Sequence, residues 1–178
     1  MSNNGKYGKT GSLSCEPVAD YVIADMAALE ALYGPPVKTR RQESDHLQPA
    51  FREFVSRSPF LILATHGPQG VDASAKGDDA GFVLAPDEKT LLIPERGANG
   101  RNDSLRNIVC QPRVALTFFA PGLPDLLRVS GHAHISVAPE LVQRFPLPVP
   151  RSVIVVEVEE AFMQCSRAVQ RSGIWKSS

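Results

Sequence analysis

The sequence lacks a long hydrophobic run, an excess of charge of one sign, and any pair of closely spaced cysteines. Its longest apolar stretches, such as Phe60–Ala64 and Val153–Val156, are far too short to span a bilayer, so we expect no membrane association. Lysine plus arginine number 19 and aspartate plus glutamate number 19, which leaves no net charge before histidines are counted. Without a net positive field, we expect no nucleic-acid partner.

The cysteines Cys15, Cys110 and Cys165 are widely separated, and no Cys-x-x-Cys pair occurs. This spacing argues against a zinc site or a disulfide framework and favours free thiols in a reducing compartment. The first fifteen residues contain no apolar segment of the kind that a secretory signal needs. We therefore expect a cytoplasmic location.

The chain is rich in short, strand-like segments that turns connect. Hydrophobic residues make up 43% of the 178 residues and charged residues 21%, a composition that supports one well-packed core. No regular alternation of strands and helices is present, which disfavours a doubly wound sheet. The pattern predicts a mainly β protein, a small antiparallel barrel with peripheral helices. We expect strands over 60–65, 71–75, 81–85, 90–93, 113–119, 127–137 and 152–158, and helices over 18–33, 44–55, 101–110, 139–145 and 165–173.

The same pattern divides the chain into three parts: a flexible tail over 1–17, a helical segment over 18–57 that packs on the barrel, and the barrel domain over 58–178. Within the barrel, residues 127–137 alternate between apolar and polar, which indicates one buried face. Residues 152–158 hardly alternate, which suggests burial on both faces. We expect a partner subunit or the terminal helix to cover the second face.

The common catalytic motifs are absent: the sequence has no Gly-x-Ser-x-Gly, His-Glu-x-x-His or Gly-x-Gly-x-x-Gly. Gly8-Lys9-Thr10 resembles the end of a P-loop, but Asn3 stands where the motif needs glycine. His132 and His134 share one face of a strand, but no third metal ligand is evident, so we expect no metal site. The aspartates are interpreted as surface carboxylates; these are Asp72, Asp78, Asp79 and Asp87.

One segment, residues 94–108, favours an anion site. It places Arg96, Asn99, Arg101 and Ser104 in a glycine-bearing loop that runs from a strand into a helix. Such a loop presents backbone N–H groups and the positive end of a helix to an anion, and arginine suits phosphate. Lys76 adds a cation at the end of another strand.

Six segments in this order resemble the pyridoxamine-phosphate-oxidase-like FMN-binding split-barrel superfamily, in its PPOX-class FMN-dependent bacterial branch. They are SPFLILAT (58–65), ASAKGDDAGFV (73–83), LLIPERGANGRNDSLRNI (91–108), QPRVALTFFAPG (111–122), LRVSGHAHIS (127–136) and VEEAFMQCSRAVQRSGIW (158–175). The resemblance implies a six-stranded antiparallel split β-barrel that forms a homodimer with flavin mononucleotide (FMN) at the subunit interface.

The resemblance also implies which residues bind FMN. The phosphate cradle maps onto Ser74, Lys76, Arg96, Asn99, Arg101 and Ser104, while Arg167, Arg171 and Trp175 approach the flavin from the partner chain. The branch commonly has arginine at Lys76 and His-Cys at Gln164-Cys165. The Arg-x-His ending of the pyridoxamine-phosphate oxidases is missing, so vitamin B6 oxidation is not expected.

These features predict an FMN-dependent oxidoreductase in which the flavin carries the redox chemistry and a small molecule serves as substrate or electron donor. The lack of a protein-borne catalytic constellation agrees with this prediction. Two alternatives stay open: a non-catalytic flavin-binding sensor, carrier or stress protein, and a relative that binds the deazaflavin F420 or haem. Haem would need a histidine, for which His66 or His134 is the candidate.

Overall fold

The computed structural model describes residues 22–35, 43–97, 100–123, 125–165 and 167–173. The chain falls into two units, Met1–Thr39 and Arg40–Ser178. In the first unit, α1 (Met26–Tyr33) begins where the Asp25 carboxylate accepts a hydrogen bond from the Ala28 N–H at 2.8 Å. This cap explains why the described part of the helix starts later than the apolar pattern indicates. Among the described residues, no helix is long and apolar enough to cross a membrane.

The described part of the second unit begins with an extended segment, residues 43–48, followed by a helix. In this segment Ser44 forms an isolated β-bridge with Ala161, and the Leu47 N–H donates to the Glu88 carbonyl at 2.7 Å. Helix α2 (Pro49–Arg57) then starts at a proline, whose fixed φ suits the first helical position. The predicted start near residue 44 was therefore wrong. The buried face of α2 belongs to the main core and consists of Phe51, Phe54 and Val55.

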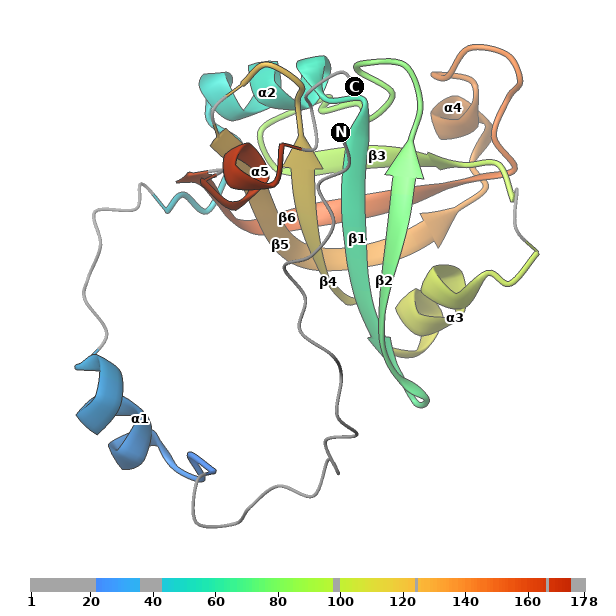
Figure 1. The fold of residues 1–178 in the computed structure, drawn as a ribbon. Coiled ribbons are helices and arrows are strands. Elements are labelled where there is room, and N and C mark those ends of the chain that lie inside the picture. Colours follow the sequence, from blue (N-terminus) through green and yellow to red (C-terminus); the bar gives the residue numbers. More distant parts are fainter. Residues whose placement is uncertain (1–21, 36–42, 98–99, 124, 166, 174–178) are drawn as a thin grey trace, which may run out of the picture. The chain divides into compact units, whose positions relative to one another are not determined.

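Six antiparallel strands form one sheet in the order β2-β1-β4-β5-β6-β3, which curls around the core (Figure 1). The strands are β1 (Phe60–Gly67), β2 (Gly70–Gly77), β3 (Thr90–Glu95), β4 (Arg113–Phe119), β5 (Asp125–Ser136) and β6 (Ser152–Cys165). β2 and β3 are the two edges of the sheet and do not pair with each other. The predicted split barrel is confirmed, and the split lies between β2 and β3.

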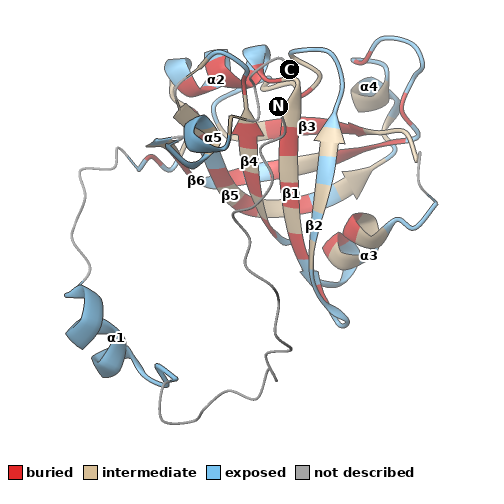
Figure 2. Ribbon diagram, in the orientation of Figure 1, coloured by how far each residue is buried: buried red, intermediate tan, exposed pale blue. Residues whose placement is uncertain are grey.

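Figure 2 shows alternating burial along the central strands. In β5 the predicted alternation holds: Leu127 and Val129 are buried, whereas Arg128 is exposed. The register between β5 and β6 shifts at Ser130/Gly131. A Cβ atom at Gly131 would lie 1.9 Å from the Glu157 carbonyl oxygen, so this close approach of two strands requires glycine.

β6 is longer than predicted, with 14 residues, because it continues through the acidic segment after Val158. Its first half is buried on both faces, as expected. Ile154 and Val156 belong to the main core, whereas Val153 packs with Leu92 and Phe145 in a second cluster. Residues of α4 (Pro139–Val142) pack against this second cluster. The same chain therefore covers the face that was assigned to a partner subunit or the terminal helix.

Four further predictions need correction. Residues 81–85 form no strand, because Gly81 has a φ of +84° in a turn closed from Phe82 N–H to the Asp79 carbonyl; a single bridge joins Leu84 to Leu92. Helix α3 (Asp103–Cys110) begins two residues late, since Asn102 has a left-handed φ of 57°. Helix α4 is one turn long. Helix α5 (Arg167–Ser172) is shorter than the helix predicted over 165–173, because Cys165 is the last residue of β6.

Candidate functional site

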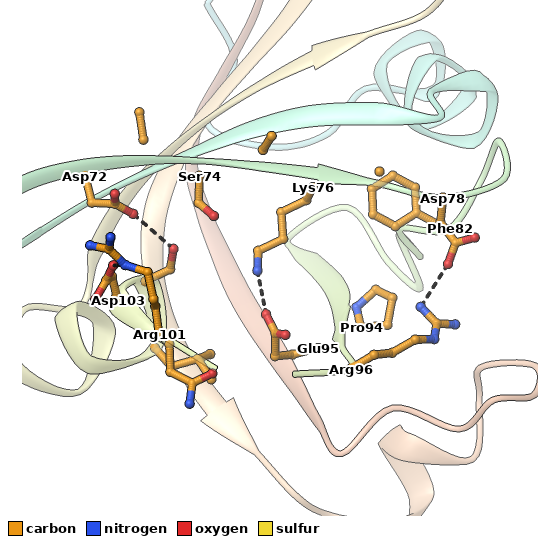
Figure 3. Close-up of a pocket in the computed structure, with 16 residues that line it drawn as sticks. Asp72, Ser74, Lys76, Asp78, Phe82, Pro94, Glu95, Arg96, Arg101 and Asp103 are labelled. Atoms are coloured by element: carbon orange, nitrogen blue, oxygen red, sulfur yellow. Dashed lines mark hydrogen bonds and ion pairs between the residues drawn. The ribbon is translucent and has the colours of Figure 1, made fainter. Parts of the chain in front are cut away.

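A cavity of about 660 Å³ lies in the split of the barrel (Figure 3). The second half of β2, the end of β3 and the first turn of α3 form its walls. Volumes of this size are typical of sites for small molecules and cofactors. Phe82, Pro94 and Leu105 add apolar surface beside the charged and hydroxyl-bearing side chains of the lining.

The position of β2 explains why the lining is polar. Ser74 pairs with Leu63 and Lys76 pairs with Leu61, so these side chains lie on the same face of the sheet as the buried core. On β1 that face is apolar because the barrel covers it. On β2, the edge strand, the face meets the open split instead, where polar side chains are stable because they reach water and one another. The inner face of β2 therefore lines a polar cavity, whereas the inner face of β1 lines the hydrophobic core.

An ion pair crosses the split at the centre of the cavity. Lys76 Nζ on β2 lies 2.5 Å from Glu95 Oε2 on β3, and the two side chains are 15% and 14% exposed. Figure 3 shows these side chains pointing toward each other. The other carboxylate oxygen of Glu95 accepts the Gly97 N–H at 2.8 Å.

The surroundings keep Glu95 ionised. Burial alone would raise the pKa of Glu95, but the hydrogen bonds from Lys76 and from the Gly97 N–H, with the attraction of the ammonium group, outweigh it. The pKa therefore lies below its ordinary value. At neutral pH Glu95 is therefore a carboxylate in its contact with Lys76.

A second ion pair crosses the split nearby. Arg96, directly after β3, places Nη1 2.9 Å from Oδ2 of Asp78, which directly follows β2. The Nε of Arg96 also donates to the Pro148 carbonyl at 3.0 Å. These contacts fix the arginine at the rim of the cavity. Two charge pairs thus join strand ends that share no backbone ladder.

The third group of charges surrounds the start of α3. Arg101 Nε lies 2.7 Å from Oδ2 of Asp103, and the Ser104 hydroxyl donates to Asp72 Oδ2 at 3.3 Å. The N-cap residue Asn102 makes no side-chain cap hydrogen bond. Residues 102–105 at the start of α3 line the cavity, and Asp103 adds a negative charge there.

Carboxylates outnumber cations in the lining of the cavity. The three cations of the lining, Lys76, Arg96 and Arg101, each contact a carboxylate. The lining holds four carboxylates, which are Asp72, Asp78, Glu95 and Asp103. The sequence had predicted a cationic loop without internal partners. An incoming phosphate therefore meets donors that are already paired.

A second cavity of about 350 Å³ adjoins the first and shares Asp72, Arg101 and Asp103 with it. The β1–β2 turn and the outer side of α3 complete its walls, including Arg106 and the exposed Cys110. Because they share Asp72, Arg101 and Asp103, the two cavities are neighbours. A small molecule in the second would lie next to a ligand in the first.

The family model described as pyridoxamine 5'-phosphate oxidase matches residues 47–165. The chain belongs to the pyridoxamine 5'-phosphate oxidase family. The match covers the whole six-stranded sheet and every described residue of the cavity, and it ends at the last residue of β6. Helix α5 lies beyond it.

Solved structures agree on the fold of this pyridoxamine 5'-phosphate oxidase family member. HupZ from Group A Streptococcus is 20% identical with a TM-score of 0.54, over 67% of this chain and 94% of HupZ. A candidate pyridoxamine 5'-phosphate oxidase from Lactobacillus delbrueckii is also 20% identical with a TM-score of 0.54, over 70% of this chain and 99% of its own. No curated protein matches the chain in sequence.

Within this family member, the structure brings five of the predicted cofactor residues together on one cavity: Ser74, Lys76, Arg96, Arg101 and Ser104. Arg167 and Arg171 lie on α5 and line neither cavity of their own chain. Asn99 and Trp175 lie outside the described residues.

The sequence interpretation missed the carboxylates of the lining. Asp72 and Asp78 were interpreted as surface groups, and Glu95 and Asp103 were not considered. One signal was available, because Glu95 directly precedes Arg96 and Asp103 follows two residues after Arg101.

The histidines take no part in either cavity. His132 Nδ1 lies 3.0 Å from Oε1 of Glu159 on the neighbouring strand β6, and His66 and His134 line neither cavity. Within the described ranges, no group of three or more potential metal ligands comes together.

Proposed function

We propose that this protein is an FMN-dependent oxidoreductase that binds FMN in the cavity between β2 and β3. One observation carries the proposal: three cations and two hydroxyls, predicted from sequence as a phosphate cradle, line one cavity in the split of a pyridoxamine 5'-phosphate oxidase fold. The functional group that these donors suit is a phosphate ester.

The residues present fit such a cofactor. The volume of about 660 Å³ is within the range of cofactor sites, and the lining combines donors with the apolar surfaces of Phe82 and Pro94. We infer that the three cations of the lining, Lys76, Arg96 and Arg101, would hold the phosphate, with the hydroxyls of Ser74 and Ser104 as further donors. Phe82 and Pro94 would contact the isoalloxazine ring.

FMN, when bound, supplies hydride or electron transfer. The protein's own residues then have three tasks: binding, orientation and electrostatic tuning. Lys76 and Arg96 offer donors to an anionic ligand in the split, where the ligand competes with Glu95 and Asp78 for them. Gly97 fixes the Glu95 carboxylate, and thereby the ammonium of Lys76, at one position.

We further propose that the protein acts as a homodimer through the outer face of β1, β2 and β4. The register places small or apolar side chains side by side there; the paired residues are Phe60, Ile62, Ala64, Ala73, Ala75, Ala115, Thr117 and Phe119. None is charged, and the rings of Phe60 and Phe119 lie 5.7 Å apart. A sheet face in contact with water usually alternates to polar residues, so this face suits a second copy.

In such a dimer, α5 of one chain would reach the cavity of the other. Arg167 and Arg171 line neither of the two cavities described above, which is compatible with a role in a partner's site. The adjoining second cavity is the place we propose for the small-molecule substrate or electron donor.

The visible spectrum of the purified protein, with identification of the released chromophore, tests this function. We expect flavin absorption near the wavelengths of oxidised FMN, and FMN as the released compound. Haem, F420, or no uptake of FMN by the ligand-free protein would contradict the proposal. Reduction of bound FMN by a nicotinamide donor, followed by reoxidation, would separate an enzyme from a passive carrier.

A further inference from the structure

The cations that would bind a ligand phosphate already have internal anions as partners. Lys76 contacts Glu95 across the split at 2.5 Å, and Arg96 contacts Asp78 at 2.9 Å. Both contacts link the end of β2 to the end of β3, where the sheet has no backbone ladder. A phosphate entering between these strands therefore competes with carboxylates of the chain itself.

We propose that Glu95, and to a lesser degree Asp78, occupy the cations that a ligand phosphate would otherwise contact. Competition between these carboxylates and the phosphate then sets how strongly the cavity binds phosphorylated ligands. The inference rests on the proposed function and deepens it, since it concerns the selectivity of the same cavity. Glu95 becomes a specificity-determining residue.

Burial distinguishes Glu95 from the other carboxylates. The Lys76 and Glu95 side chains are 15% and 14% exposed, whereas Arg101 and Asp103 are 79% and 40% exposed. Water and salt screen the exposed pair, so its interaction is weak. The buried pair is screened much less, and the Gly97 N–H holds the carboxylate in place at 2.8 Å. Glu95 thus has the largest effect on the charge that a phosphate encounters.

Removing this charge without changing the shape should improve phosphate binding. In Glu95→Gln the side-chain oxygen still accepts the Gly97 N–H, while Lys76 loses its anionic partner. A charge-assisted hydrogen bond from Lys76 then becomes available to the ligand, so we expect about ten-fold tighter binding of phosphate. Riboflavin, which has no phosphate, should bind equally to both proteins.

The matched control is Asp79→Asn. Asp79 is exposed, directly follows Asp78 and does not line the cavity, so this variant changes the net charge equally without touching the cation pairs. Calorimetric titration of ligand-free wild type, Glu95→Gln and Asp79→Asn with inorganic phosphate measures the effect. Tighter binding in Glu95→Gln alone supports the inference. Equal affinity in wild type and Glu95→Gln, or an equal gain in Asp79→Asn, overturns it.

A second variant keeps the test valid if Glu95→Gln does not fold. Asp78→Asn removes the partner of Arg96, whose pair is more exposed at 42% for Asp78, so we expect a gain of about three-fold. No gain in this variant overturns the inference as well.

FMN and riboflavin are titrated in parallel with the same proteins. Failure of FMN to bind contradicts the proposed function. The phosphate affinities of wild type and Glu95→Gln still show whether Glu95 competes with phosphate. The two failures are therefore distinguishable.

Discussion

Lys76 on β2 and Glu95 on β3 lie 2.5 Å apart, and their contact joins the two edges of a sheet that share no hydrogen-bonded ladder. The pair therefore has two roles. It links the two edges across the split, and it holds a part-buried ammonium group where a phosphate would bind. Each role leads to a measurable effect.

The first prediction concerns acid stability. Because the folded-state pKa of Glu95 is lowered, its contribution to the free energy of unfolding is present above the ordinary pKa and is lost as pH falls through the folded value. In Glu95→Gln we expect a loss of about 1–3 kcal/mol at pH 7 that disappears at low pH. Urea denaturation of both proteins from pH 7 downward measures this difference.

The difference in unfolding free energy between wild type and Glu95→Gln reports on Glu95 and not on Asp45, the second described group with a lowered pKa. Asp45 also has a lowered pKa, from hydrogen bonds with His46 and Lys89, but it is unchanged in both proteins. A difference in unfolding free energy that stays constant with pH would contradict the assignment.

The second prediction concerns the close approach of β5 and β6. Gly131→Ala would place a Cβ atom 1.9 Å from the backbone oxygen of Glu157, so the strands must move apart. We expect a loss of about 2–4 kcal/mol in unfolding free energy. In Gly77→Ala the nearest atom lies at 3.2 Å and belongs to the Phe60 side chain, so the loss should be smaller. Equal losses in chemical denaturation would argue against the strand contact.

The third prediction concerns the arginines of α3 and the loop before it. Arg101→Ala should weaken FMN binding roughly ten-fold, because a charged donor is lost from an exposed position. Arg106→Ala is the control, since Arg106 is exposed and lines the second cavity but not the first. Fluorescence titration with FMN measures both. An unchanged affinity in Arg101→Ala, or equal losses in both variants, would remove Arg101 from the site.

The fourth prediction tests the shared site of the dimer. Deleting residues 165–178 should weaken FMN binding, although the first cavity stays complete within each chain. A heterodimer of this deletion with an Arg101→Ala chain then contains one intact site and one site damaged twice. Tight FMN binding at half of the sites after mixing is the expected result. No recovery on mixing, or a monomer in light scattering, would exclude the shared site.

The sequence predicted the fold well where burial follows a simple period. In β5, Leu127 and Val129 alternate with Arg128, and the strand was identified from that pattern. The second half of β6 was missed because Glu159 and Glu160 follow one another across the register shift. Residues 81–85 were predicted as a strand from their apolar composition, which reflects the burial of Val83 in the core and not pairing.

The candidate site was predictable only in part. Five cation and hydroxyl positions could be proposed because a strand end and a loop before a helix are local features. The pairs Lys76–Glu95 and Asp78–Arg96 depend on the curl of the whole sheet, which brings residues about twenty positions apart together at the split. Local patterns carry no information about such contacts, so the pairing of cations with carboxylates in the cavity emerged only from the structure.

The most direct test of the central claim is the ratio of the dissociation constants for riboflavin and FMN, measured by titration of the ligand-free wild-type protein at low salt. The two ligands differ only in the phosphate, which is the group that the cations and hydroxyls of this cavity are proposed to bind. We predict that FMN binds at least ten-fold more tightly. Equal dissociation constants would contradict phosphate recognition by this cavity.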